Sequence, residues 1–160
     1  MTNERTIVAA PGTQSIAFSR EFEAPAARVF EAHVDPGLLA QWIGPRGTRL
    51  ELRAFEPKTG GSWSYIVVGG DRQWPFHGSF HEVTAPTRIV QTWEYDDEPG
   101  HPSMEIFEFV DLPGERSRID GLSVFLSVEE RDSMLGDFDK GRDDDFERLD
   151  ELLSGAAVPS

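Results

Sequence analysis

The middle of the chain is a series of strand-like segments followed by one long helix-like segment, and this order most restricts the fold. From residue 48 to residue 125, Gly and Pro divide the sequence into six such segments, a pattern typical of strands joined by short turns. Short connections favour antiparallel neighbours. The expected strands are Arg49–Phe55, Ser62–Val68, Gln73–Val83, Arg88–Tyr95, Met104–Val110 and Ser117–Leu126.

The segment after these strands has the period of an amphipathic helix. Ser127 and Glu130 match a capping box at its start. An antiparallel sheet needs a cover for its apolar face, and this is the only predicted element long enough to provide one. One face of the helix repeats at steps of three or four residues and carries Leu135, Phe138, Arg142, Phe146, Leu149 and Leu153.

The N-terminal part is expected to add one strand and two short helices. Gln14–Phe22 alternates apolar residues with period two. The helical spacing within residues 25–35 places Val29, Phe30 and His33 on one face, and Asp35-Pro36 ends that helix. Residues 36–42 can form the second helix.

The predicted fold is therefore α+β: a curved, seven-stranded antiparallel sheet wrapped on a long C-terminal helix, with two short helices after the first strand. We expect a single domain over residues 13–154 and a C-terminal tail over 155–160. Residues 1–12 are expected to form an N-terminal tail, in which Thr6–Ala9 could be a short strand.

The acidic composition restricts the possible partners. The formal net charge is -14, which argues against nucleic acid and anionic membrane surfaces. The chain has no cysteine, so disulfides, thiolate zinc sites and cysteine nucleophiles are excluded. There is no apolar run of the roughly 20 residues that span a membrane, and the start is too polar for a secretory signal. A cytoplasmic protein without a cofactor is expected.

Four stretches, in this order and spacing, resemble the AHSA-type family (activator of heat-shock-protein-90 ATPase homologue-like) of the START/SRPBCC superfamily. The resemblance spans residues 14–153 and implies the helix-grip fold. It also implies binding of apolar molecules such as lipids, hormones or polyketides, because that is what superfamily members bind, although some are cyclases, dehydratases or hydroxylase components. The stretches are Phe22-Glu23-Ala24-Pro25 with Val29-Phe30-Glu31-Ala32 and Asp35-Pro36, then Gln41-Trp42-Ile43-Gly44-Pro45, Gly60-Gly61-Ser62-Trp63-Ser64-Tyr65, and Gly78-Ser79-Phe80-His81-Glu82-Val83 with Pro86-Thr87-Arg88-Ile89-Val90-Gln91-Thr92-Trp93.

The candidate site is the space between the sheet and the C-terminal helix. If the apolar face of each strand points at the helix, aromatic side chains line that space. They would form either a solid core or the wall of a cavity. The candidate ligand-binding residues are His33, Trp42, Trp63, Tyr65, Trp74, Phe76, Phe80, Gln91, Trp93, Glu105, Phe107, Phe138 and Arg142.

Three polar candidates belong to this face. Alternation places Gln91 and Glu105 on it, although a slip of one residue would turn Glu105 to solvent. Arg142 could pair with Glu105, bind a ligand carboxylate, or extend its head to solvent or to a neighbouring aspartate. The family often has an aromatic residue where this chain has His33, and Gly-Trp where it has Gly141-Arg142, so polar groups replace two bulky rings.

Two other clusters are interpreted as surface features. Asp143, Asp144 and Asp145 point about 100° apart on a helix and are expected to form a solvated acidic face rather than a metal site. His77 and His81 are about 13 Å apart on a strand, which is too far for one ion, and they alternate away from the aromatic residues.

The preferred hypothesis is a protein that binds a small apolar molecule, with or without a carboxylate. A second hypothesis is a cyclase- or dehydratase-type enzyme that uses Glu105 or His33 as its acid–base residue. The third is a stress-response module that contacts a chaperone, although the chain lacks the part of the namesake activator that binds the chaperone's middle domain. A homodimer is compatible with the sequence, which does not define the oligomeric state.

Overall fold

The structure is a computed structural model that describes residues 3–155, apart from the side chains of residues 137–143. In this part of the chain it has eight strands and three helices. In chain order they are β1 (Thr6–Val8), β2 (Ser15–Phe22), α1 (Ala26–Val34), α2 (Pro36–Leu39), β3 (Arg49–Phe55), β4 (Ser62–Gly69), β5 (Arg72–Thr84), β6 (Arg88–Tyr95), β7 (Ser103–Leu112), β8 (Arg116–Val124) and α3 (Val128–Leu153).

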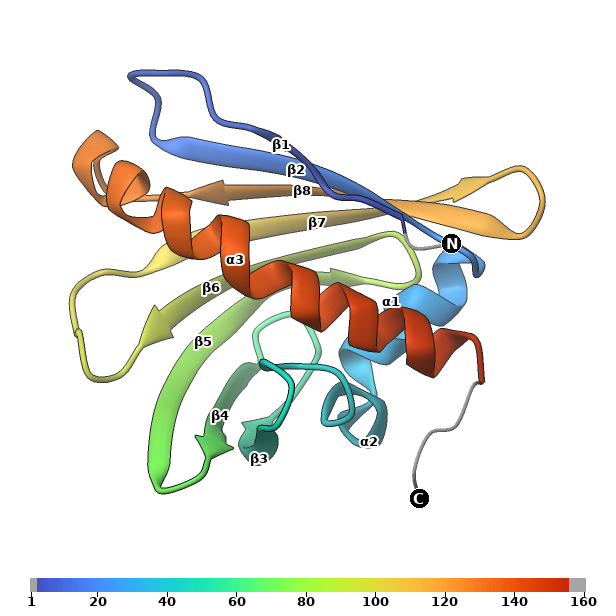
Figure 1. Cartoon of the computed structure of the whole chain (residues 1–160), viewed down its shortest axis with the longest axis horizontal. Helices are drawn as coiled ribbons and strands as arrows, with labels where there is room; N and C mark the ends of the chain where they lie inside the picture. The colour runs from blue at the N-terminus through green and yellow to red at the C-terminus, as the bar shows by residue number, and fades with distance from the viewer. Residues whose placement is uncertain (1–2, 156–160) are drawn as a thin grey trace.

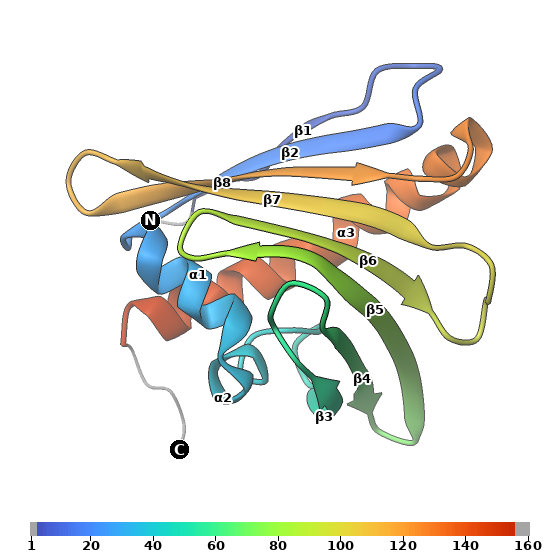
Figure 2. The same cartoon turned by 180° about the vertical axis from the view of Figure 1, so that it is seen from behind.

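The strands form one antiparallel sheet in the order β1-β2-β8-β7-β6-β5-β4-β3. Helix α3 crosses one face of this sheet (Figure 1), and the opposite view shows the sheet in front of the helix (Figure 2). Ser127 is the N-cap of α3, as predicted, because its Oγ accepts a hydrogen bond of 3.1 Å from the Glu130 amide. This arrangement confirms the predicted helix-grip fold.

The sheet has eight strands rather than the seven that we expected. The additional strand is β1, which pairs with β2 through Thr6 to Ser19, Ile7 to Phe18 and Val8 to Ala17. The free edge of β2 offers unpaired backbone groups, and a short partner strand satisfies them. Ile7 also packs against the core, so both backbone pairing and apolar burial hold this segment in place.

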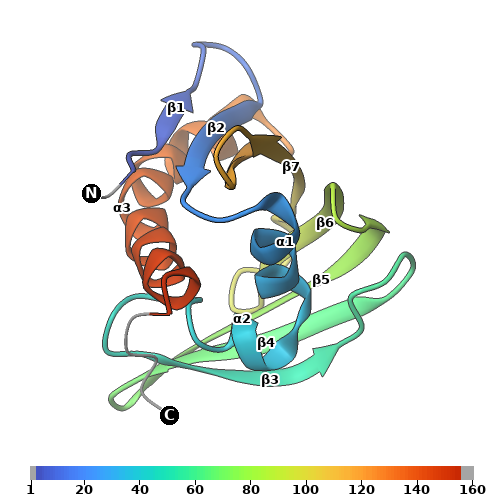
Figure 3. The ribbon, with the colours of Figure 1, turned by 90° about the vertical axis from the view of Figure 1, so that its right-hand side faces the viewer.

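The face of the sheet toward α3 is its inner face, and one half of it is densely packed. On β2 the side chains of Phe18 and Phe22 contact the ring of Phe146 on α3, with ring centroids 5.7 and 5.5 Å apart. On β7 the ring of Phe109 lies 5.2 Å from that of Phe30 on α1. Figure 3 views the end of the molecule where α1 and α2 lie between α3 and the sheet. This half of the interior is a solid core.

Helix α3 is the longest element and is strongly charged. It contains 26 residues, yet no helix in the described part of the chain is long and apolar enough to cross a membrane.

Candidate functional site

The other half of the inner face carries a continuous row of aromatic rings on strands β4, β5 and β6. We call these five residues, Trp63, Tyr65, Phe76, Trp93 and Tyr95, the aromatic row. The rings of Trp63 and Tyr65 stack at 4.8 Å, and that of Tyr65 lies 5.9 Å from Phe76. Phe76 in turn lies 5.0 Å from Trp93 and 5.2 Å from Tyr95.

The aromatic row differs from the packed half in its burial. Trp63 is buried, but the other four members of the row are only partly buried. Their register shows that they point to the inner face, because Tyr65 pairs with Phe76 and Phe76 pairs with Tyr95. These rings therefore face α3 while retaining contact with solvent.

Polar side chains lie beside the aromatic row on β6, β7 and β8. Glu105 pairs with Gln91 on one side and with Ser123 on the other. Gln91 Nε2 donates to Glu105 Oε1 at 3.2 Å, and Ser123 Oγ donates to Glu105 Oε2 at 3.5 Å. Glu105 is 4% exposed. The carboxylate therefore points inward, and the one-residue slip that would have turned it to solvent does not occur.

Several other predicted site residues lie within or beside the packed core. Trp42 is buried, and its indole nitrogen donates to the Ala32 carbonyl at 2.9 Å. His33 is partly buried, with its ring 4.7 Å from that of Trp42. Its Nδ1 lies 2.7 Å from the Val29 carbonyl oxygen; because a carbonyl only accepts, Nδ1 carries the proton. Phe107 is also buried in this core.

Two predicted residues lie near the ends of the aromatic row. Phe80 is buried and makes an edge contact with Phe55 at 6.0 Å. Trp74 is partly buried, and the Arg72 guanidinium lies 5.1 Å from the centroid of its ring. The side chains of Phe138 and Arg142 lie outside the described residues, so their predicted places in the site stay predictions.

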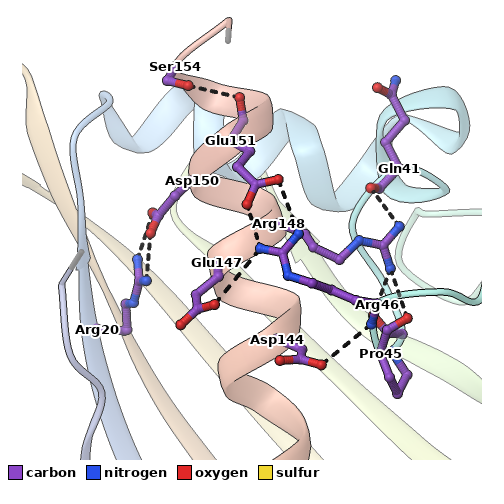
Figure 4. A network of polar contacts seen from close by, with 11 residues as sticks. Arg20, Gln41, Pro45, Arg46, Asp144, Glu147, Arg148, Asp150, Glu151 and Ser154 are labelled. Carbon is purple, nitrogen blue, oxygen red and sulfur yellow. Dashed lines mark hydrogen bonds and ion pairs between the residues drawn. The ribbon is translucent and has the colours of Figure 1, made fainter. Parts of the chain in front are cut away.

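The turn after α2 is fixed to α3 by a network of polar contacts, which Figure 4 shows at close range. Arg148 on α3 donates to the carbonyl oxygens of Gly44 at 2.7 Å and Gln41 at 3.1 Å. In return, the Gly44 amide donates to Asp145 Oδ1 at 2.9 Å. The Arg46 guanidinium forms ion pairs with Glu151 and Glu147. Residues 41–46 therefore connect the N-terminal helices to α3.

This network corrects one expectation for the aspartates of α3. Asp144 and Asp145 are not simply a solvated acidic face, because both are partly buried and accept hydrogen bonds from backbone amides of the turn. Asp144 and Asp145 lie one turn of helix from Arg148, and all three residues face the same segment. That helical spacing could be read from the sequence. The identity of the partner segment could not, because it lies about 100 residues away. The side chain of Asp143 lies outside the described residues.

The inner face presents an apolar surface with one acidic side chain, an arrangement that suits a mainly apolar ligand. The aromatic row offers flat apolar surface, and Glu105 offers a carboxylate held in place by Gln91 and Ser123.

Across the described side chains, no three His, Asp or Glu residues are grouped so as to hold a metal ion. His77 and His81 are exposed on β5. His77 contacts Glu94 at 3.2 Å and Asp96 at 2.5 Å.

The fold and its inner face define a protein of the helix-grip class. The chain belongs to the family described as Activator of Hsp90 ATPase homolog 1-like protein, AHSA1, which matches residues 23–154. A comparison with curated proteins found no match.

Solved structures with the same fold come from several bacteria. A protein from Rhodobacter sphaeroides is 21% identical, with a TM-score of 0.83, over 95% of this chain and 99% of that one. A protein from Arthrobacter aurescens is 24% identical, with a TM-score of 0.85, over 95% and 92%. The AHSA1 protein from Silicibacter pomeroyi is 22% identical, with a TM-score of 0.73, over 89% and 99%. At these identities the likeness concerns the fold alone.

Proposed function

We propose that this protein binds a small, mainly apolar molecule between the sheet and α3. The aromatic row supplies the apolar contact surface, and Gln91 and Glu105 orient the polar part of the molecule. The packed half of the interior, around Phe107 and Phe146, holds the sheet and the helix at a constant separation. A rigid frame of this kind lowers the cost of ordering a binding surface.

The partial exposure of the aromatic row carries this proposal. In a fully packed core, rings that face inward lose nearly all contact with solvent, as Phe18 and Phe109 do at 3% and 4% exposure. Tyr65, Phe76 and Trp93 face the same way but remain only partly buried. Each large aromatic side chain that a ligand covers would contribute about 1–2 kcal/mol of apolar burial. An apolar ligand is therefore the chemistry that fits this surface.

A thermal-shift screen tests the proposal. The protein is heated with a broad set of lipids, aromatic compounds and polyketide-like acids, and a ligand at about 100 times its Kd should stabilise it by about 2.7 kcal/mol. Each hit is then tested on Phe76→Leu, which removes the central ring of the aromatic row. We expect the affinity of that variant to fall about fivefold or more.

Met104→Ala is the matched control for this screen. Met104 is exposed on the outer face of the same sheet, so its truncation should leave the affinity of every hit unchanged. If no compound stabilises the protein, or if Phe76→Leu binds every hit as tightly as the wild type does, the proposal is wrong.

We also propose that the ligand can carry a carboxylate, which Arg142 would bind. This finer proposal depends on the predicted inward position of Arg142 on α3 and on the fit between a guanidinium and a carboxylate. Its test compares 2-naphthoic acid with 2-naphthamide on the wild type and on Arg142→Met. The acid should bind more tightly to the wild type, and the variant should lose that preference.

The burial of Glu105 favours an enzymatic function as a second candidate. A carboxylate that is 4% exposed beside an aromatic surface is suited to act as a general acid or base. Any hit from the screen can be incubated with the protein and analysed by mass spectrometry for elimination or cyclisation. Glu105→Gln should abolish such turnover while ligand binding persists. Turnover that is unchanged in this variant would exclude Glu105 as the acid–base residue.

The outer face of the sheet favours contact with a chaperone as a third candidate. Successive strand partners there form an apolar line from Val8 through Ala17, Leu122 and Ile106 to Val90, and the family description names an activator of Hsp90 ATPase. The test is the ATPase rate of an Hsp90-type chaperone with and without the protein. A rate that is unchanged at large excess would contradict this candidate.

A further inference from the structure

The indole N–H of Trp63 is a buried donor that the rest of the described chain leaves without a hydrogen bond. Trp63 is 4% exposed, and its Nε1 has no hydrogen-bond partner among the described residues. An unsatisfied buried donor costs about 1–3 kcal/mol, and such groups are rare in native proteins. The other buried tryptophan, Trp42, shows the usual situation, since its Nε1 donates to the Ala32 carbonyl.

The position of this N–H is set by a glycine on the neighbouring strand. Trp63 on β4 pairs with Gly78 on β5. A Cβ atom at Gly78 would lie 2.6 Å from Trp63 Nε1 and 2.7 Å from its Cε2, so the nitrogen edge of the indole lies against the bare backbone. The same Cβ would lie 1.9 Å from the Thr92 carbonyl oxygen. Gly78 therefore permits an indole placement that no other residue would allow.

The indole ring that carries this donor is part of the aromatic row on the inner face. The Trp63 ring stacks on that of Tyr65 at 4.8 Å and 27°, and Tyr65 leads to Phe76 along the aromatic row. A molecule lying on these rings would place its end beside Trp63. The row thus combines an apolar surface with one buried donor at its β4 end.

We propose that the ligand presents a carbonyl-type oxygen to the Trp63 N–H while its apolar part lies on Tyr65, Phe76 and Trp93. Trp63 is then a specificity-determining residue. A site that contains a buried donor discriminates against hydrocarbons, because binding them leaves the donor unpaired. This inference rests on the proposed function and adds to it the chemical class of the ligand.

Two pairs of probes isolate the carbonyl group. Fluorene and 9-fluorenone share one ring frame and differ by a carbonyl, and so do diphenylmethane and benzophenone. Affinities are measured by titration calorimetry on the wild type, Trp63→Phe and Trp93→Phe. We expect the wild type to prefer each ketone by about five- to tenfold, which corresponds to one hydrogen bond.

Trp63→Phe keeps most of the apolar surface and removes the N–H, so it should lose the preference for ketones. Trp93→Phe is the matched control: it should weaken both members of each pair alike and retain the preference. The ratio within one variant is the readout, so a general loss of affinity does not mimic the expected effect. If Trp63→Phe does not fold, NMR of the wild-type indole N–H signals replaces it, and one signal should move downfield with each ketone only.

Three results would overturn this inference. They are equal affinity of the wild type for ketone and hydrocarbon, a preference that persists in Trp63→Phe, and no binding of any of the four probes. None of these results decides the proposed function, which is judged by the broad ligand screen.

Discussion

Arg20 shows at the scale of one residue how this fold accommodates a charge in its core. It lies on the inner face of β2 between Phe18 and Phe22, and it is 3% exposed. Its guanidinium donates two hydrogen bonds of 2.7 Å to the carboxylate of Asp150 on α3 and lies 4.7 Å from the centroid of the Phe22 ring. A buried cation with such partners avoids most of the cost of desolvation.

Replacing Arg20 by Met should therefore destabilise the protein clearly. The variant leaves Asp150 without its partner and detaches α3 from β2, so we expect a loss of about 1–3 kcal/mol. Urea denaturation measures the change. Arg118→Met is the control, because Arg118 pairs with Asp120 on the more exposed outer face, and we expect its effect to stay within about 0.5 kcal/mol. Equal effects would show that the Arg20 pair contributes little.

Helix α3 is attached to the rest of the molecule by polar contacts near both of its ends. Near its start the Glu130 carboxylate contacts the His101 ring, which belongs to the loop between β6 and β7. Toward its end Arg148 and Asp145 hold the turn of residues 41–46. Each attachment can be weakened separately, because the two lie about four to five helical turns apart.

The attachment at the start of α3 should depend on pH. The Glu130 carboxylate raises the pKa of His101 above the ordinary value of 6.5, through a hydrogen bond and through its charge. A group with a raised folded-state pKa contributes stability that is fully present below its unfolded pKa and is lost as the pH rises through the folded pKa. Thus the stability difference between the wild type and His101→Gln should be larger at about pH 6 than at about pH 9.

Chemical denaturation at the two pH values measures this difference. Glu130→Gln removes the partner of His101 and should abolish the same pH-dependent contribution. A difference that is constant with pH, or that grows as the pH rises, would show that the His101–Glu130 contact does not stabilise the folded state.

The attachment at the end of α3 should control the turn of residues 41–46. Arg148→Met removes the donors to the carbonyl oxygens of Gln41, Ile43 and Gly44, so the turn should open more often. Hydrogen exchange of the Gly44 amide should speed up at least about tenfold, equivalent to about 1.4 kcal/mol of lost protection.

Arg46→Met is the matched control for that experiment. It removes an arginine from the same network whose partners, Glu147 and Glu151, are exposed, and exposed pairs contribute little. If Arg46→Met accelerates the exchange of Gly44 as much as Arg148→Met does, the ion pairs and not the carbonyl contacts hold the turn.

At the scale of the whole molecule, the acidic charge opposes the compact state. The net charge is -14, and residues 129–151 hold eleven acidic and four basic residues, a net of -7. Repulsion among these charges is screened by salt. Raising NaCl from about 10 mM to about 200 mM should increase the thermal midpoint by about 2–4 °C. Calorimetry checks this, and a lower midpoint would mean that screening of ion pairs outweighs screening of the repulsion.

Local sequence patterns were sufficient to predict the architecture and many of the residues on the inner face. Period-two alternation indicated which side of each strand faces the helix, and the register confirms the inward position of Tyr65, Phe76, Gln91 and Glu105. The reason is that strand geometry alone sends alternate side chains to opposite faces. Arg20 was not identified as an inward residue, because a charged residue in an apolar series gives no sign of its partner.

The sequence by itself determined the order of the elements from β2 onward, the helix-grip fold and the aromatic composition of the inner face, since these follow from periods that act over a few residues. Only the tertiary structure decided that Arg20 meets Asp150 across 130 residues, that the aspartates of α3 hold the turn at Gly44, and that the Trp63 N–H lies unpaired over Gly78. Contacts of this kind depend on where packed elements cross, and crossing positions are a property of the assembled core and not of any local period.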